Sequence, residues 1–132
     1  MLYSAKEIKM QKILFILGSL LGALGVLLGA FGSHAFKSIL EANNRLSTFE
    51  TGIKYHFVHV IAIFITAFMM EKYPSKLLTY AGMSFTAGIL LFSGSLYILS
   101  LTGYTKWGAV APIGGLAFTL GWILILLTVL RN

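Results

Sequence analysis

Four apolar segments, separated by short polar ones, set the pattern of this chain. At about 1.5 Å per residue, a helix over residues 13–36 or 77–101 is long enough to cross the ~30 Å hydrocarbon core of a bilayer. The second uncharged segment is shorter, so its helix has to begin in the polar turn before it. The pattern predicts an all-α membrane protein with an antiparallel bundle of four transmembrane helices, over residues 13–36, 49–71, 77–101 and 107–130.

The polar connections contain residues that typically end helices. Asn43 and Asn44 indicate a break before the second helix. Pro74 marks the turn before the third helix, because the residue preceding a proline avoids helical backbone angles. Ahead of the first helix lies a short leader with three lysines. We expect no cleaved signal peptide, since the apolar segment that follows exceeds the about 7 to 15 residues of a signal sequence.

Five glycines in the first predicted helix fall at alternating steps of four and three residues. At about 100° per residue this spacing aligns them along one side of the helix, here called the glycine face: Gly18, Gly22, Gly25, Gly29 and Gly32. In lipid, glycines let a second helix approach closely. We therefore expect this helix to be the axis of the bundle, with further close packing at Gly88 of the third helix and at Gly114 and Gly121 of the fourth.

The composition is that of a chain embedded in a membrane. Of 132 residues, 58% are hydrophobic and 11% are charged, whereas a soluble domain has about 25% charged residues. The length allows a single domain, residues 1–132, with no segment left for a separate soluble core. The net charge of +6 comes from basic residues beside the apolar segments, which suits contact with the headgroups of a lipid bilayer and not with nucleic acid. The chain has no cysteine, which excludes disulfides and thiolate ligands.

Four spans place both termini on the same side of the membrane. The side of the termini then has six basic residues and the other side has four: Lys6, Lys9, Lys12, Lys72, Lys76 and Arg131 against Lys37, Arg45, Lys54 and Lys106. By the positive-inside rule, this excess predicts that both termini of the multi-pass chain are cytoplasmic.

Polar side chains within the predicted spans concentrate in one half of the membrane, toward the first and third connections. Counting from the middle of each uncharged segment places the three histidines about 5 to 13 Å from the midplane on that side. Ionisable groups within a span face the interior of a bundle by default. We therefore predict a small polar pocket in this half, lined by His34, Tyr55, His56, His59, Ser93, Ser95 and Tyr97.

The histidines allow three interpretations. They could form a structural hydrogen-bond network, handle protons or cations, or ligate haem or a metal through His34 together with His56 or His59. A metal fits poorly, because the nearby acid Glu50 faces away and a zinc site would lack a third and a fourth protein ligand. We assign no metal and no cofactor. On the fourth helix, Trp122 needs a partner for its N–H inside the bundle.

Four strings of residues resemble a known family: LGAFGSH at 28–34, TGIKYHFVH at 51–59, LFSGSLYILSL at 91–101, and APIGG followed by GW at 111–115 and 121–122. They look like the YgdD/YwdK family of small bacterial membrane proteins, which also has mitochondrial relatives in animals. The resemblance implies a four-helix protein of the bacterial inner membrane without an assigned activity. It also implies that His34, Tyr55 and His59 recur in the family, whereas the position of His56 is often glutamine.

No set of a nucleophile, a base and an acid is found, and the four carboxylates all lie at predicted membrane interfaces. We therefore expect no enzymatic activity. Two functions remain open. In the first, the chain is a structural or accessory membrane module, as a homo-oligomer or with a partner membrane protein, and its polar groups hold helices together. In the second, it binds or transports a small solute, proton or cation through the polar half of the bundle.

Overall fold

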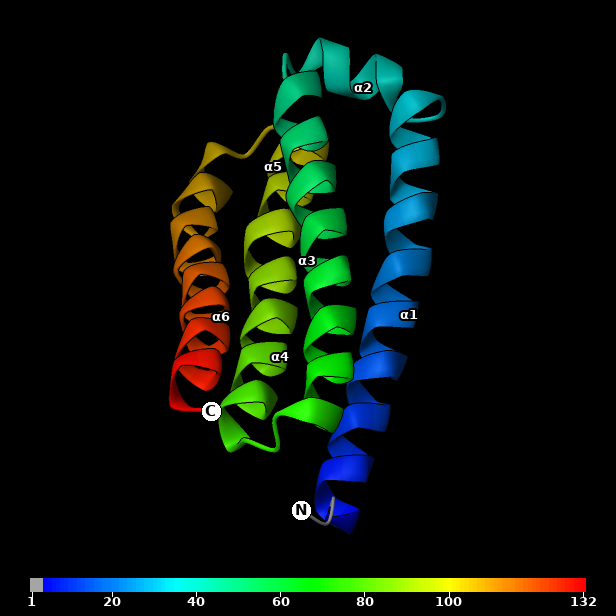
Figure 1. The fold of residues 1–132 in the computed structure, drawn as a ribbon. Coiled ribbons are helices and arrows are strands. Elements are labelled where there is room, and N and C mark those ends of the chain that lie inside the picture. The colour runs from blue at the N-terminus through cyan, green and yellow to red at the C-terminus, as the bar shows by residue number, and fades with distance from the viewer. Residues whose placement is uncertain (1–3) are drawn as a thin grey trace.

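The computed structural model describes residues 4–132, and it consists of helices and their connections (Figure 1). Four stretches are long and apolar enough to cross a membrane, as predicted: Ala5–Ser33, Leu46–Lys72, Lys76–Thr102 and Thr105–Arg131. The first is α1 and the second is α3. The third comprises α4 (Lys76–Gly88), a π-helix η1 (Ile89–Ser93) and α5 (Gly94–Thr102), and the fourth comprises a 3-10 turn η2 (Thr105–Ala109) and α6 (Ala111–Arg131). A short helix, α2 (Lys37–Ala42), connects α1 to α3.

The ends of the first two spans differ from the prediction. Helix α1 starts within the charged leader, because Ser4 and Glu7 form a capping box in which each side chain bonds to the backbone N–H of the other. The polar connection after α1 contains the helix α2, which the sequence did not indicate. Its Leu40 is fully buried. Asn44 has a left-handed backbone angle, φ 54°, so the predicted break occurs there and α3 begins at Leu46.

Neighbouring spans run antiparallel in the order α1, α3, α4–α5, α6, and both termini lie at the same end of the bundle (Figure 1). In the most apolar 18 residues of each span, 44% and 56% of the residues are buried in the two middle spans, against 22% in each outer span. Helix α1 is therefore an outer helix, and the expectation that it forms the axis is wrong. Its five glycines lie on one side and contact one neighbouring helix, whereas a helix on the axis of a bundle packs against several.

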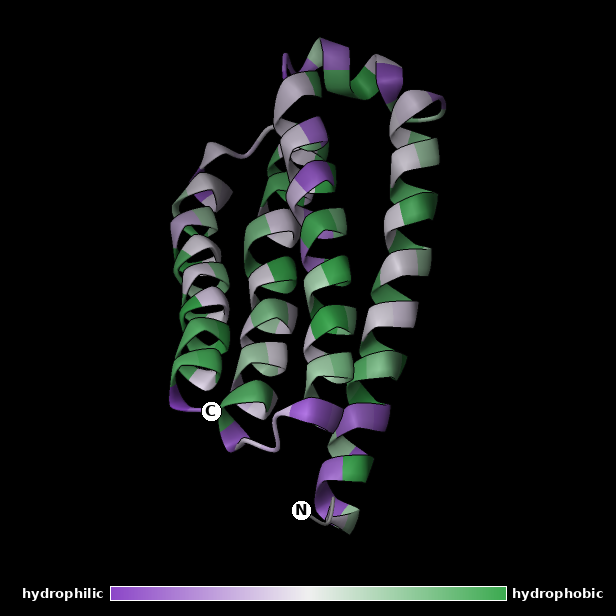
Figure 2. Ribbon diagram, viewed as in Figure 1, coloured by the Kyte–Doolittle hydropathy of each residue, from purple (hydrophilic) through white to green (hydrophobic). Residues whose placement is uncertain are grey.

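Hydrophilic residues gather at the two ends of the bundle, and apolar residues cover the length between them (Figure 2). Many large apolar side chains point outward along this length. Leu20, Phe68 and Leu116 are 64%, 61% and 71% exposed. An apolar girdle between two polar ends is the surface expected of a protein surrounded by lipid.

The glycine face of α1 lies directly against α3. The side chains nearest to these glycines come from successive turns of α3 in antiparallel order: Phe64 at Gly18, Val60 at Gly22, Phe57 at Gly25, Ile53 at Gly29 and Phe49 at Gly32. At Gly18, Gly25 and Gly32 the α3 side chain lies where a larger α1 residue would need space, whereas the contacts at Gly22 and Gly29 are looser. This is the small-residue packing that stabilises helix pairs in lipid.

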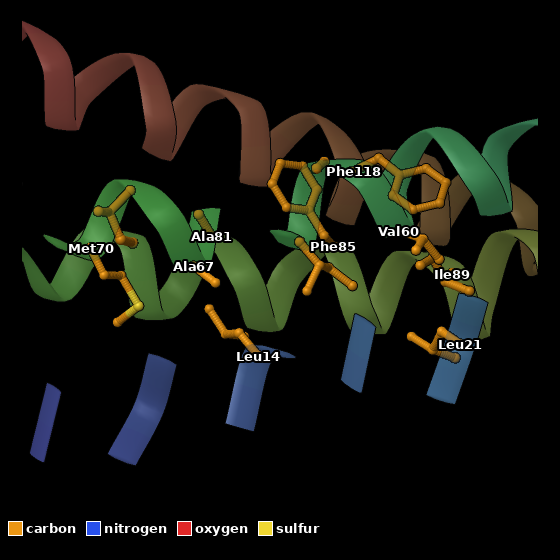
Figure 3. Close-up of a cluster of buried hydrophobic side chains, with 12 residues drawn as sticks. Leu14, Leu21, Val60, Ala67, Met70, Ala81, Phe85, Ile89 and Phe118 are labelled. Carbon is orange, nitrogen blue, oxygen red and sulfur yellow. The ribbon is translucent and has the colours of Figure 1, made fainter. Parts of the chain in front are cut away.

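The core between α4 and α6 is built from aromatic rings and glycines. The ring of Phe118 on α6 lies against Gly88 of α4, and the ring of Phe85 on α4 lies against Gly121 of α6. Both phenylalanines are buried, and Figure 3 shows them on facing helices, with Leu14 of α1 on the far side of the same cluster. Two of the predicted packing glycines of the later helices, Gly88 and Gly121, therefore accept rings from the opposite helix, while Gly114 lies against the backbone of Phe92.

Candidate functional site

His56 of α3 connects three helices. Its ring is 1% exposed, with Nε2 2.7 Å from the backbone oxygen of Leu21 on α1 and Nδ1 2.8 Å from the hydroxyl of Tyr97 on α5. A carbonyl oxygen can only accept, so Nε2 carries a proton and donates it to Leu21. In the neutral ring, Nδ1 then accepts from the Tyr97 hydroxyl. The imidazole is held by one donor and one acceptor bond.

The glycine face makes the bond to Leu21 accessible. A Cβ atom on Gly25 would lie 3.2 Å from Nε2 of His56, so any larger residue would press on the imidazole. The carbonyl of Leu21 has a second lone pair beside its helical bond. Without a side chain at Gly25, the ring of His56 can reach that lone pair.

Ser93, the last residue of η1, makes a similar bond from the third span to α3. Its hydroxyl donates to the backbone oxygen of Gly52 at 2.7 Å, and the serine is fully buried. The accepting carbonyl belongs to a glycine, and a Cβ on Gly52 would lie 2.8 Å from the ring of Tyr97. Two buried polar side chains therefore bond to backbone oxygens of a neighbouring span.

His59, one turn after His56, is held differently. Its Nδ1 lies 2.7 Å from the backbone oxygen of Tyr55, and its Nε2 accepts from the indole N–H of Trp122 on α6 at 3.1 Å. Nδ1 must donate to the carbonyl, and the indole can only donate, so Nε2 must be without a proton. His59 is thus a neutral imidazole with its proton on Nδ1. The predicted partner for the N–H of Trp122 exists, and it is His59.

Aromatic rings surround His59. Its imidazole stacks on Phe118 with ring centroids 3.5 Å apart and planes 7° apart. Tyr55 packs on Phe92, with centroids 4.7 Å apart, and lies near Phe118. The site at His59 is therefore an aromatic cluster between α3, η1 and α6, in which the histidine, the tryptophan and the hydroxyl of Tyr55 are polar.

A groove of about 600 Å³ lies over this cluster, between α3 and α6. Its lining contains Tyr55 and His59 but not the other predicted pocket residues: Lys54, Tyr55, Val58, His59, Phe92, Pro112, Gly115, Leu116, Phe118, Thr119 and Trp122. The groove is open to the outside of the bundle. It does not extend to His56 or Tyr97.

The residues predicted to line one polar pocket separate into distinct positions. His56, Ser93 and Tyr97 belong to the buried network with α1 and α3, while Tyr55 and His59 border the groove. Ser95 is buried, and its hydroxyl donates to the backbone oxygen of Phe92 within the same span. His34 caps the end of α1 and is exposed. Neither His56 nor Tyr97 lines the groove at His59.

Some polar contacts between distant parts of the chain could not be predicted from the sequence, and in most of them one partner is a backbone oxygen. Gln11 of α1 donates to the backbone oxygen of Ala67, and its amide also bonds Glu71 at the end of α3. Asn43 of the first connection donates to the backbone oxygen of Ser100 in α5. Any residue supplies a carbonyl, so only the donor is visible in a sequence, and a donor alone does not identify its partner.

The buried histidines have no free ring nitrogen for a metal ion. Both nitrogens of His56 and both nitrogens of His59 are engaged by protein groups. Within residues 4–132, no group of three or more His, Cys, Asp and Glu side chains could hold an ion. Ligation by either buried histidine would first require the loss of one of these hydrogen bonds, which joins two helices in every case except the bond of His59 Nδ1 to Tyr55 within α3.

Comparison with known proteins identifies the family. The model of a family described as "Protein of unknown function (DUF423)" matches residues 28–115. The chain belongs to the DUF423 family. The DUF423 match runs from the end of α1 to the start of α6, so it includes every predicted pocket residue, and Trp122 follows it.

Relatives of this DUF423 chain are described as membrane proteins. The "UPF0382 membrane protein YwdK" of Bacillus subtilis is 40% identical over 122 residues, which is 92% of this chain and 98% of the relative. The "UPF0382 inner membrane protein YgdD" of Escherichia coli K12 is 33% identical over 121 residues, 92% of each chain. No solved structure matches the chain. The resemblance found in the sequence is confirmed, and it is to a membrane protein family without an assigned activity.

Proposed function

We propose that this protein is a non-enzymatic structural module of the membrane, in which buried polar side chains fasten the helices to one another. The observation that carries the proposal is that all four ring nitrogens of the two buried histidines bond to protein groups. A catalytic or transporting imidazole needs a nitrogen that can exchange a proton or bind a ligand. Here every such exchange would break a contact within the bundle.

The partners of these side chains support the same function. His56 on α3 forms hydrogen bonds to α1 and to α5. Ser93 of η1 donates a hydrogen bond to α3, and Trp122 of α6 donates one to His59 on α3. Together they connect all four spans. In lipid there is no hydrophobic drive between helices, so such hydrogen bonds, at about 0.6 kcal/mol each, and the glycine contacts hold the arrangement.

Transport through the bundle has less support. A path for protons or cations would have to join the polar groups through space that water can enter. The groove borders His59 alone of the two buried histidines, and His56 lies under other side chains. The polar half of the membrane thus holds two separate packed clusters.

Proton flux and stability together test the structural role. Wild type, His56→Leu, His59→Leu and His56→Gln are each placed in vesicles that contain a pH-sensitive dye, and the thermal midpoint (Tm) of each is measured in detergent. We expect no flux above that of protein-free vesicles and a lower Tm for both leucine variants. A wild-type flux that disappears in His56→Gln while the Tm stays unchanged would contradict the proposal.

We also propose that both termini face the cytoplasm, on the basis of the six-to-four excess of basic residues at that end. The chain has no cysteine, so single cysteines report the orientation directly. Ser38 in α2 and Asn132 are exposed and lie at opposite ends of the bundle. A membrane-impermeant maleimide should label Ser38→Cys in intact cells and Asn132→Cys only after permeabilisation; the opposite result would reverse the orientation.

A further inference from the structure

The groove between α3 and α6 faces the lipid. Side chains at its rim are well exposed, with Val58 at 47%, Leu116 at 71% and Trp122 at 43%. Its floor is aromatic, and the rings of Phe92 and Phe118 lie 5.6 Å apart between centroids. Water does not fill an apolar hollow at this depth in a bilayer. An apolar chain of suitable width fits it.

Gly115 keeps the groove open. A Cβ atom built on Gly115 would have no neighbour within 4 Å, whereas one on the preceding Gly114 would overlap the backbone of Phe92. Gly114 is therefore needed for the contact of α6 with η1. Gly115 has no such contact, and its missing side chain leaves free volume in the groove.

The length of the groove matches one leaflet. Its lining on α6 runs from Pro112 to Trp122, which is about 15 Å along a helix. The hydrocarbon of one leaflet is about 15 Å thick, half of ~30 Å. The groove begins near the end of the bundle where the two connections lie and reaches the middle of the membrane.

The end of the groove at the membrane surface is positively charged. Lys54 in the early turns of α3 lines it and is exposed. The lining, which belongs entirely to the described part of the chain, contains no acidic residue. A lysine at this level attracts an anionic headgroup. We propose that the groove binds one chain of an anionic phospholipid, with its phosphate at Lys54 and its acyl chain over Tyr55, Phe92 and Phe118.

A second hollow near Lys54 is less suited to a lipid chain. It has a volume of about 400 Å³ and lies between the end of α1 and the start of α3, where Glu50 opposes an anion. On α1 its lining reaches only to Gly29, and beyond Gly29 the glycine face is covered by α3. It can hold a headgroup but not the length of an acyl chain.

Native mass spectrometry tests the proposal with two dioleoyl lipids, phosphatidylglycerol and phosphatidylcholine, on the full chain. We expect wild type to retain one phosphatidylglycerol in preference to phosphatidylcholine. Lys54→Gln should lower the affinity for phosphatidylglycerol about fivefold and leave phosphatidylcholine unchanged, because it removes one charge near the headgroup. Gly115→Phe should weaken both lipids, because the ring fills the groove, and Val58→Trp provides a second variant that narrows it.

Two control variants distinguish an effect on the groove from a general effect of losing a charge or adding a ring. Lys106→Gln removes a basic residue at the same end but outside the lining, and Leu126→Phe adds a ring to an exposed α6 position outside it. Both should bind like wild type, and the Tm without added lipid reports whether each variant is folded.

Equal binding of the two lipids by wild type, or wild-type binding by folded Lys54→Gln and Val58→Trp, would overturn the proposal. So would a dimer of wild type that Gly115→Phe converts to monomer, since a second copy would then occupy the groove. Any of these results would leave the structural role of the histidines untouched.

Discussion

Trp122 of α6 determines the protonation of His59 on α3. Its indole N–H lies 3.1 Å from Nε2 of His59, and Nδ1 lies 2.7 Å from the backbone oxygen of Tyr55. Since the indole only donates and the carbonyl only accepts, the imidazole has one proton and a fixed tautomer. A bond between the outer helix α6 and the middle helix α3 thus also keeps a buried histidine neutral.

Removing the indole N–H tests this bond. Trp122→Phe keeps an aromatic ring but leaves Nε2 of His59 without a donor. We expect a loss of about 0.6 kcal/mol in the free energy of unfolding, the typical value for a hydrogen bond between membrane helices, in addition to any loss of packing. A double-mutant cycle with His59→Phe separates the two terms, using the Tm in detergent. Zero coupling energy would show that the bond does not contribute, and Trp107→Phe, at a half-exposed interfacial position, serves as the control.

His56 tolerates glutamine better than leucine. A glutamine amide offers an N–H for the backbone oxygen of Leu21 and an oxygen for the hydroxyl of Tyr97, so it can replace both bonds of the neutral imidazole. Leucine offers neither and leaves the tyrosine hydroxyl buried without a partner, at a cost of about 1 to 3 kcal/mol. We expect the Tm of His56→Gln to be close to wild type and that of His56→Leu to be clearly lower. The reverse order would mean that the ring is retained for its shape.

Two alanine substitutions on the glycine face, Gly32→Ala and Gly29→Ala, should differ clearly in their effect on stability. A Cβ on Gly32 would overlap the ring of Phe49, which is 2% exposed and cannot move aside, whereas the nearest atom to a Cβ on Gly29 is Cγ2 of Ile53 at 4.0 Å. Gly32→Ala should lower the free energy of unfolding by about 1 to 3 kcal/mol through overpacking. Gly29→Ala should stay within about 0.5 kcal/mol of wild type. Equal Tm values for both variants would contradict the close contact of α1 with α3 at Gly32.

Neighbouring glycines of α6 provide a second matched pair. In Gly114→Ala the new methyl group meets the backbone of Phe92 in η1, and a backbone cannot rotate away as a side chain can. We expect a loss near the upper end of overpacking effects, about 3 kcal/mol, seen as poor accumulation in the membrane and a much lower Tm. Gly115→Ala should resemble wild type, and a stability as low as that of Gly114→Ala would show that α6 is rotated from the orientation described.

Most of the fold could be predicted from the sequence because lipid leaves few alternatives. Long apolar segments must form helices that satisfy their own backbone bonds, so the four spans followed directly. The alignment of Gly18 to Gly32 also predicted a close contact, and the contact with α3 is present. The central position of α1 was wrong, since a single aligned face shows that one neighbour is close and does not show how many others there are.

The candidate site was less predictable, for physical reasons that particular residues illustrate. Depth counting placed His56, His59 and Tyr97 at similar levels, but it did not show that His56 turns to α1 and His59 to α6. The acceptors at Leu21 and Gly52 are backbone oxygens, which any residue could supply. Trp122 was expected to need a partner, and only the packing of α6 across Phe118 determines that the partner is His59.

The π-helix at Ile89–Ser93 determines which neighbour each half of the third span contacts. The N–H of Gly94 bonds to the oxygen of Ile89, so one residue more than in an α-helix fits into this turn and rotates everything after it by about 100°. Before the π-helix, α4 packs mainly on α6, and after it α5 turns to α3. A chain one residue shorter here would keep the same hydropathy, the same glycines and the same number of spans. Yet Tyr97 would point away from His56, so the length of this turn matters as much to the protein as its composition.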